Sequence, residues 1–522
     1  MLLRMSEEYK LWLPALSHGD RRSCQHLNMI KPVALPLATA GRRQKQSAFT
    51  ENRLLFLVGV LVVVLIVTTT DCGPYGIAVF SSCWVVFLLE RALLGDTLST
   101  KYLTLPSFFM ICYLMALSIP SIWTFTEMRY SIRDTYLLAV ESVLVTFPFG
   151  VGLANLMFKN PKGIIREYAR QPLQRTRENF KFYPAFIILI VSLLPLLTPY
   201  FVLARHIQLF EVLKAYPTPI NPLVLRFAEG ELPLVVQFCF EVARRFVLPF
   251  CALYAFFMAQ VYTGKWMFMF WCLFLATMGI SLLTLDRAEP FVFCVMLVIA
   301  YMLKRRLSPM QALRSPKIVI GLALGLVLVG VISVTQYQSA FTLERVIDDV
   351  WYGATNRLFI SPSAMASEAF TIFDSPRLFA HGKYERIFFF LPGHSYTDSL
   401  TGQSLIVAPL TFVGNLWGNW GWTGVILGTI IIGFIYQSIQ LTIFIRKSTP
   451  LLALQVIMLC NAAWIIWGKA LSVMSISILM FGVAFGLFMR GVHREETQPR
   501  PHRRPATFPA RPKRAIPIDS GA

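Results

Sequence analysis

A charged turn, Asp286-Arg287-Ala288-Glu289, separates two apolar runs and offers the clearest chemistry in this 522-residue chain. The run before the turn covers about 266–285. The run after it, 290–303, is shorter than the roughly 20 residues that a helix needs to cross a bilayer. Charges at that depth rarely face lipid, so they mark candidate functional sites. An arginine there could hold a phosphate or diphosphate, which favours an enzyme acting on a lipid-linked substrate.

More candidate side chains lie in a long polar segment, 338–404. Arg357 and Arg386 are each flanked by apolar residues, which predicts that they point inward, and arginine binds phosphate oxygens through two parallel hydrogen bonds. A histidine near a sugar hydroxyl could act as a general base, with a carboxylate as the alternative. The candidate bases are His381, His394, Glu368, Glu385 and Asp398. An exposed surface position without a chemical role is the competing interpretation for each.

Two asparagines, Asn415 and Asn419, are four residues apart and share a face if 412–420 is helical. On that face they could bind sugar hydroxyls. The tryptophans that could stack on a sugar ring beside them are Trp417, Trp420 and Trp422. Hydrogen bonding between membrane helices is the alternative role for the two amides.

The composition places these residues in a polytopic membrane protein. The chain is 56% hydrophobic and 15% charged, with a mean hydropathy of +0.59, and its apolar runs have the length of transmembrane helices. About twelve spanning helices are predicted, so the predicted fold class is all-α. Their ranges are 54–70, 73–90, 102–123, 136–158, 184–204, 246–262, 266–285, 288–303, 317–337, 423–444, 451–467 and 470–489.

The distribution of charge orients these helices. With both termini in the cytoplasm, 34 of the 48 Lys and Arg residues lie on the cytoplasmic side and 14 on the other, as expected from the basic character of cytoplasmic loops. The same rule explains the net charge of +20, so nucleic-acid binding is not expected. The predicted regions are a basic, disordered cytoplasmic tail (1–53), nine helices (54–337), a large outward loop (338–404), a segment with the last three helices (405–489) and a basic, Pro-rich cytoplasmic tail (490–522).

Three further features qualify this topology. The outward segment 205–245 is expected to contain a short interfacial helix before the sixth spanning helix. The segment 405–422 is apolar but rich in Gly, Asn and Trp, and it is either re-entrant or part of an aromatic belt at the outer interface. Glu141, inside the fourth predicted helix, is expected to be a partnered structural carboxylate, with a proton relay as the alternative.

Three stretches of the chain resemble the bacterial Wzy-type O-antigen and oligosaccharide-repeat-unit polymerases. The first is 281–290, where Arg287 stands at the outer end of a helix pair, and the second is 356–373 followed by His381-Gly382. The third is 414–424, which is similar to the family's N-x-G-W-x-G entry into a helix, with Trp420 in the usual aromatic place. The topology is similar as well. Asp286 departs from the pattern, in which a small residue precedes the arginine.

The resemblance implies a glycosyltransferase of the bacterial cytoplasmic membrane that needs no metal or cofactor. It would move a growing glycan from undecaprenyl diphosphate to the sugar of an incoming lipid-linked repeat unit, in a pathway that includes a chain-length regulator and a flippase. The residues implied to hold the diphosphate are Arg287, Arg357 and Arg386. The implied bases are His394, Glu385 and Glu368, and the implied sugar-binding residues are Asn415, Asn419 and Trp420. A ligase acting on finished glycans is the nearest alternative, and a transporter or flippase is the alternative outside the enzymes.

Overall fold

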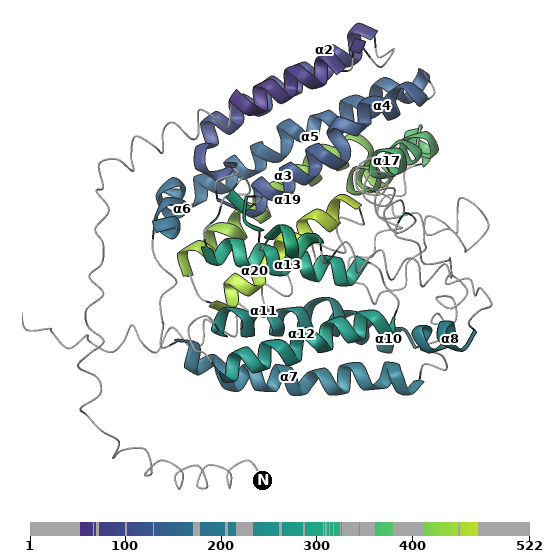
Figure 1. Ribbon diagram of the computed structural model, residues 1–522. Coiled ribbons are helices and arrows are strands. Elements are labelled where there is room, and N and C mark those ends of the chain that lie inside the picture. The colour runs from purple at the N-terminus through teal and green to yellow at the C-terminus, as the bar shows by residue number, and fades with distance from the viewer. Residues whose placement is uncertain are drawn as a thin grey trace, which may run out of the picture. The chain divides into compact units, whose positions relative to one another are not determined.

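The structure is a computed structural model of the whole chain, and it describes part of it. The described residues are 53–65, 67–68, 73–99, 102–128, 130–170, 178–203, 207–215, 233–259, 264–284, 288–305, 307, 311–312, 314–316, 318–323, 325, 344, 361–378, 411–446 and 449–467. Within these ranges all regular secondary structure is helical (Figure 1). The predicted all-α class is therefore confirmed for the part of the chain that is described.

The α-helices follow one another along the chain in the order of their labels in Figure 1. They are α2 (Gly73–Leu94), α3 (Leu105–Tyr113), α4 (Ile119–Glu127), α5 (Tyr130–Met157), α6 (Pro161–Arg170), α7 (Glu178–Leu203), α8 (Gln208–Ala215), α10 (Leu234–Val242), α11 (Leu248–Ala259), α12 (Lys265–Leu283), α13 (Ala288–Arg305), α17 (Ser361–Ile372), α19 (Phe412–Arg446) and α20 (Thr449–Trp467). A π-helical turn, Leu114–Ser118, joins α3 to α4, and a second one, Ala243–Val247, joins α10 to α11. Short 3₁₀ turns cover Gly95–Thr97 and Pro376–Leu378.

Seven helices among the described residues are long and apolar enough to cross a membrane: α2, the α3–α4 helix, α5, α7, the α10–α11 helix, α12 and α19. Two shorter apolar helices cover Arg53–Leu65 and Thr449–Ala463. The protein is thus a multi-pass α-helical membrane protein. Most of the predicted helix 317–337 and all of 470–489 lie outside the described residues, and the total of twelve remains a prediction.

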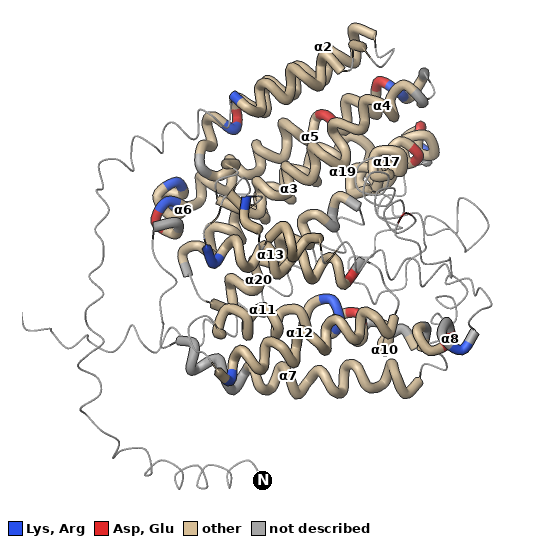
Figure 2. The backbone as a smooth tube through the Cα atoms, viewed as in Figure 1, with Lys and Arg blue, Asp and Glu red and all other residues tan. Residues whose placement is uncertain are grey.

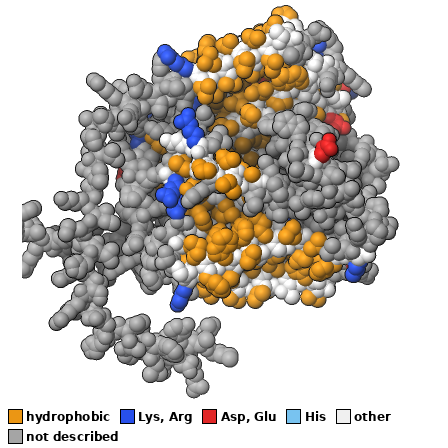
Figure 3. Space-filling model, viewed as in Figure 1, with side chains coloured by type: hydrophobic (Ala, Val, Ile, Leu, Met, Phe, Trp, Pro, Cys, Tyr) orange, Lys and Arg blue, Asp and Glu red, His pale blue; other side chains and the backbone are white. Residues whose placement is uncertain are grey.

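The surface of these helices is that of a protein surrounded by lipid. Phe268 and Leu275 on α12 and Leu194 on α7 expose 73%, 65% and 68% of their area, although large contiguous apolar patches are rare on soluble proteins. Figure 3 shows hydrophobic side chains across the face in view. Basic residues gather near the margin of that face, as Figure 2 also shows along α6 and near the ends of several helices.

The centre of the helical assembly is the contact between α5 and α19. The two backbones touch at two glycines: a Cβ placed on Gly150 would lie 2.1 Å from the carbonyl oxygen of Ile430, and one placed on Gly433 would lie 2.3 Å from that of Phe147. Small residues allow membrane helices to approach this closely. A hydrogen bond of 2.6 Å between Thr146 and Thr429 adds a polar contact across the same interface.

A bridge formed by α20 connects this central pair with the remaining helices. On one side α20 contacts α3 and α19, and on the other it contacts α11 and α13 (Figure 1). Nearly all of its described side chains are buried, as expected for a helix that is apolar all round. The predicted helix 451–467 is therefore present within α20.

The residues predicted on the cytoplasmic side meet at one end of the assembly. The amphipathic helix α6 buries Ile165 and stacks Tyr168 on Phe444 near the end of α19, with ring centroids 4.0 Å apart. Lys162 donates to the carbonyl oxygen of Leu93 at the end of α2. These contacts agree with the predicted grouping of loops, while the side of the membrane they face remains a prediction.

Part of the predicted outward loop packs at the opposite end. In α17, Ser363 is hydrogen-bonded to Thr124 of α4 at 2.9 Å, and its carbonyl oxygen accepts from the hydroxyl of Tyr136 at 3.0 Å. The indole of Trp417 donates to the carbonyl oxygen of Phe373, just after α17. The loop thus contributes a helix seated on α4, α5 and the start of α19.

The predicted start of the sixth spanning helix at residue 246 is wrong. The span begins at Val235 and runs to Ala259 through the π-helical turn. Three charged residues at 241–245 mark a helix end by composition, yet they pair with one another and with α13, so the helix continues through them. The short helix expected in 205–245 is present as α8.

The segment 405–422 is described from Thr411 onward, and it contains a helix that folds back. Gly421 has φ 58° and ψ −139° inside α19, a conformation that is essentially restricted to glycine. As a result, Leu416 packs on Gly428: a Cβ on Gly428 would lie 2.8 Å from the Leu416 side chain. In one continuous helix, twelve residues would separate these positions by about 18 Å.

This fold-back gives a direct prediction. Cysteines placed at Leu416 and Gly428 are expected to form an intramolecular disulfide on oxidation, detected as a mobility shift under non-reducing conditions. Adding Gly421→Ala should abolish the cross-link, because alanine does not tolerate this backbone conformation. A cysteine pair at Leu416 and Ile432 would serve as a spacing control. Equal cross-linking with and without Gly421→Ala would contradict the predicted role of this glycine.

Candidate functional site

The charged turn identified in the sequence ends at Glu289, and both Glu289 and the nearby Thr284 contact arginines of another helix. Asp286 and Arg287 lie outside the described residues, but Thr284 before them and Glu289 after them are described. Thr284 Oγ1 accepts a hydrogen bond of 2.8 Å from Arg244 Nη1. Glu289 Oε1 forms an ion pair with Arg245 Nε at 2.8 Å. Both sides of the turn are therefore held against the π-helical turn that joins α10 to α11.

Glu241 completes this group, which we call the ionic cluster: Glu241, Arg244, Arg245, Thr284 and Glu289. Its Oε1 accepts from Arg244 Nη2 at 2.7 Å, and its Oε2 lies 2.6 Å from Arg245 Nε. The spacings i, i+3 and i, i+4 place all three side chains on one side of the helix. Arg244 is only 5% exposed and lies over the ring of Phe240. Two arginines and two carboxylates thus balance in charge beside an apolar core.

The paired guanidinium groups of the ionic cluster have the chemistry of an anion site. Carboxylate and phosphate present the same pair of oxygens to a guanidinium, so a phosphate group can replace Glu241 or Glu289 at an arginine that is already oriented. Arginine keeps its charge when it is partly desolvated, and a charge in such surroundings acts more strongly than in water. With both carboxylates in place the cluster is neutral, so it stabilises negative charge on a phosphate only when that phosphate displaces a carboxylate from an arginine.

The predicted sugar-binding asparagines lie on one face of the short helix before Gly421, as their spacing indicates. Both are buried, with 1% of Asn415 and 0% of Asn419 exposed. Asn419 Nδ2 donates to Asn415 Oδ1 at 2.8 Å and to the Asn415 carbonyl oxygen at 3.0 Å. The Nδ2 group of Asn415 is buried and makes no hydrogen bond to any residue in the described part of the chain.

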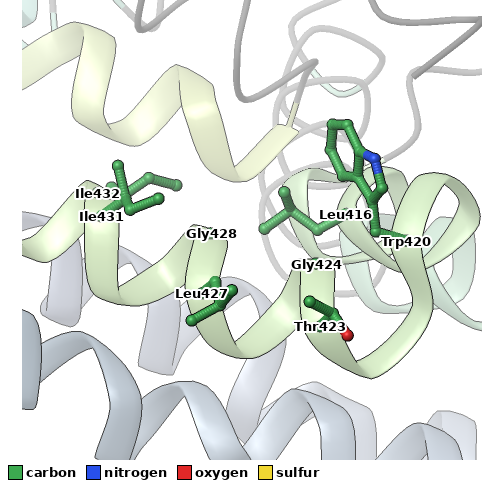
Figure 4. Close-up of a pocket in the computed structure, with 8 residues that line it drawn as sticks. All are labelled: Leu416, Trp420, Thr423, Gly424, Leu427, Gly428, Ile431 and Ile432. Carbon is green, nitrogen blue, oxygen red and sulfur yellow. The ribbon is translucent and has the colours of Figure 1, made fainter. Parts of the chain in front are cut away.

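An apolar groove begins at Trp420 and follows the longer part of α19 (Figure 4). Its volume is about 260 Å³. The residues that line it are Leu416, Trp420, Thr423, Gly424, Leu427, Gly428, Ile431 and Ile432. Leu427 and Ile431 are about half exposed, so the groove opens to the outside of the helical assembly within a candidate span. Its chemistry fits a hydrocarbon chain.

Comparisons were made with protein families, curated proteins and solved structures. None of them matches this chain.

Most of the other predicted site residues lie outside the described residues: Arg287, Arg357, Glu385, Arg386 and His394. Glu368 is described and stands exposed on α17. The structure thus brings together Asn415, Asn419 and Trp420 on a single helical segment, and it places α17 against the same segment. It does not relate the predicted arginines to one another.

Sequence reasoning missed Arg244 and Arg245. Hydropathy places them in the outward segment 205–245, because an apolar run ends where charged residues begin. A signal was nevertheless present: Glu241 precedes the two arginines by three and four residues, which is the spacing of ion pairs along one helix face. Such a charged triplet at the end of an apolar run is compatible with a helix that continues.

Proposed function

We propose that this protein polymerises lipid-linked oligosaccharide repeat units at the outer face of the bacterial cytoplasmic membrane. The single observation behind the proposal is the ionic cluster, which packs two partly desolvated arginines against the charged turn that resembles the polymerase family. Polymerisation of this kind needs cations beside the leaving diphosphate, and a membrane-embedded arginine pair supplies them.

The proposed roles follow from position and chemistry. Arg244 and Arg245 act with Arg287 of the adjacent turn to hold the diphosphate of the donor lipid. The undecaprenyl carrier chain lies along membrane-exposed apolar surface, for which the groove on α19 is suited. A base takes the proton of the acceptor hydroxyl. The candidates for that base are Glu368 on α17, Glu385 and His394.

The acceptor sugar needs polar contacts on the same side of the membrane. Asn415, whose buried Nδ2 group makes no hydrogen bond within the described part of the chain, and Asn419 and Trp420 provide candidate contacts on a segment that packs against α17. This arrangement supports binding of a glycan between the outward loop and the start of α19. The further residues proposed to hold the diphosphate from that loop are Arg357 and Arg386.

The proposal is tested in a strain that lacks the gene, by separating its surface glycan on a gel. Deletion is expected to leave a single repeat unit in place of a ladder, and the intact gene should restore the ladder. Arg287→Ala should fail to restore it, because the charge beside the leaving diphosphate is lost. If Arg287→Ala restores the ladder fully, Arg287 does not take part in binding the diphosphate.

Two further outcomes of the same gel separate the alternatives. A ladder that persists on the carrier lipid but is missing from its final lipid acceptor would indicate a ligase. An unchanged ladder after deletion would contradict the polymerase proposal and favour transport or another polymer.

A further inference from the structure

Glu141 is a fully buried carboxyl in the middle of α5 that the proposed function does not use. Its Oε1 and Oε2 atoms lie 3.1 and 3.0 Å from the hydroxyl oxygen of Ser118, and Oε1 lies 3.3 Å from the hydroxyl oxygen of Ser121. Ser118 is the last residue of the π-helical turn in the α3–α4 helix. Ionisable residues inside a membrane are expensive and mark functional sites, and π-helical turns often occur at such sites.

In this network two serine hydroxyls face three acceptor oxygens of the described residues. Ser121 Oγ also lies 2.7 Å from the Ser118 carbonyl oxygen, which can only accept. Two hydroxyl hydrogens must therefore serve that carbonyl and both carboxyl oxygens. A proton on Oε1 completes the set. Glu141 then donates to Ser121, Ser121 donates to the Ser118 carbonyl oxygen, and Ser118 donates to Oε2, so each hydrogen has one acceptor.

Among the residues that the structure describes, the surroundings of Glu141 supply no positive charge in place of that proton. The titratable groups that interact electrostatically with Glu141 are Cys83 on α2, Tyr113 at the end of α3 and Tyr136 on α5. All three are neutral acids at ordinary pH. Tyr113 donates its hydroxyl to the carbonyl oxygen of Val140, next to Glu141. A bare carboxylate would therefore depend on two serine hydroxyls in a medium where charge is costly.

The same helix pair holds α17 in place. Thr124 lies on α4, six residues after Ser118, and Tyr136 lies on α5, five residues before Glu141. Each forms a hydrogen bond with Ser363 of α17, one with its hydroxyl and one with its carbonyl oxygen. Separation of α4 from α5 would break at least one of these two bonds. A change in the hydrogen bonds around Glu141 that separates the two helices would therefore also weaken the packing of α17 on them.

We propose that Glu141 is a proton-binding site and that its proton keeps α17 seated on the α4–α5 pair. Loss of the proton would place a charge in the helix interface and draw in water, which separates α4 from α5 and loosens α17. The seated state is thus favoured at low pH and weakened at high pH. The inference concerns α17 and Glu141 alone and does not rest on the proposed function.

Infrared spectroscopy of the full-length protein tests the proton directly. Wild type near neutral pH should show a protonated-carboxyl C=O band that is absent from Glu141→Gln, a variant that keeps the size and one donor of the neutral acid. The band should disappear as the pH is raised. If wild type and Glu141→Gln have the same spectrum in the region of the protonated-carboxyl C=O band, the proposal is overturned. If Glu141→Gln does not fold, Ser121→Ala should shift the loss of the band to lower pH, and an unshifted band would overturn it.

Hydrogen exchange tests the connection to α17. After correction for the intrinsic pH dependence of exchange, the amides of 361–372 should exchange about tenfold faster at high pH in wild type and at an unchanged rate in Glu141→Gln. Peptides from α6, at the other end of the assembly, provide the internal control in both proteins. A tenfold change that persists in Glu141→Gln, or its absence in wild type, would overturn the coupling.

Discussion

Replacing Arg244 by glutamine is expected to reduce polymer formation by about 100-fold or more, because loss of one donor to a developing charge typically costs about 2.7–4 kcal/mol. Arg244 is 5% exposed and links Glu241 to Thr284 at the edge of the charged turn. A glutamine at this position cannot supply the positive charge that a leaving diphosphate requires. The measurement is the ladder of surface glycan at matched protein level in the membrane.

Arg133→Gln is the matched control for this variant. Arg133 also stands near an end of a spanning helix, where it lies 3.6 Å from Asp134 and over the ring of Phe125. It is on α5, remote in sequence from the ionic cluster, and its replacement should leave the ladder unchanged. A loss in both variants would show only that arginines at helix ends are needed for folding.

A double variant separates the chemical role of Arg244 from a structural one. Removing one partner of a buried ion pair leaves an uncompensated charge, which destabilises a protein far more than removing both. Glu241→Gln combined with Arg244→Gln should therefore recover the amount of folded protein without recovering the ladder. Recovery of both would contradict the proposed contact between Arg244 and the diphosphate.

Gly150→Ala is expected to destabilise the protein by about 1–3 kcal/mol or more, the usual effect of overpacking. The added Cβ would lie 2.1 Å from the carbonyl oxygen of Ile430, and the neighbouring atoms within 3.0 Å are all backbone. A backbone carbonyl cannot rotate away as a side chain does, so α5 and α19 must separate. The measurement is the thermal unfolding midpoint of the purified protein in one detergent.

Gly279→Ala provides the comparison, because a Cβ on this α12 glycine would meet no atom within 4 Å. Alanine favours a helix over glycine by about 1 kcal/mol, so the midpoint should stay the same or rise. The same Gly→Ala substitution should thus lower the unfolding midpoint at Gly150 and leave it unchanged or raise it at Gly279. A similar small effect at both positions would show that α5 and α19 do not approach as closely as described.

Several spanning helices could be predicted from sequence because a long apolar run is a local property of the chain. The predicted ranges 73–90, 136–158 and 266–285 correspond to α2, α5 and α12 with shifts of a few residues at their ends. The charged turn was also recognisable, because three charged residues between apolar runs are conspicuous in a membrane sequence. Each of these inferences uses only neighbouring residues.

The partners of these elements depend on contacts between residues far apart in the chain. Arg245 pairs with Glu289 and Arg244 donates to Thr284, in each case across forty or more positions, whereas hydropathy alone places both arginines in a loop. The fold-back at Gly421 requires a backbone conformation that composition does not specify. The seat of α17 depends on Ser363 meeting Thr124 and Tyr136, which have no distinctive pattern around them. Single-sequence periodicity contains no information on such pairings.

The most direct test of the proposed function is the reaction itself with purified components. The full-length protein in lipid nanodiscs would be incubated with the undecaprenyl-diphosphate-linked repeat unit isolated from the deletion strain, without nucleotide sugar, and the products followed by mass spectrometry. The proposal predicts carrier lipids with two or more repeats, one undecaprenyl diphosphate released for each bond formed, and no product from Arg244→Gln. The proposal would be contradicted if folded wild-type protein left the substrate unchanged. It would also be contradicted if Arg244→Gln elongated the glycan as well as the wild-type protein does.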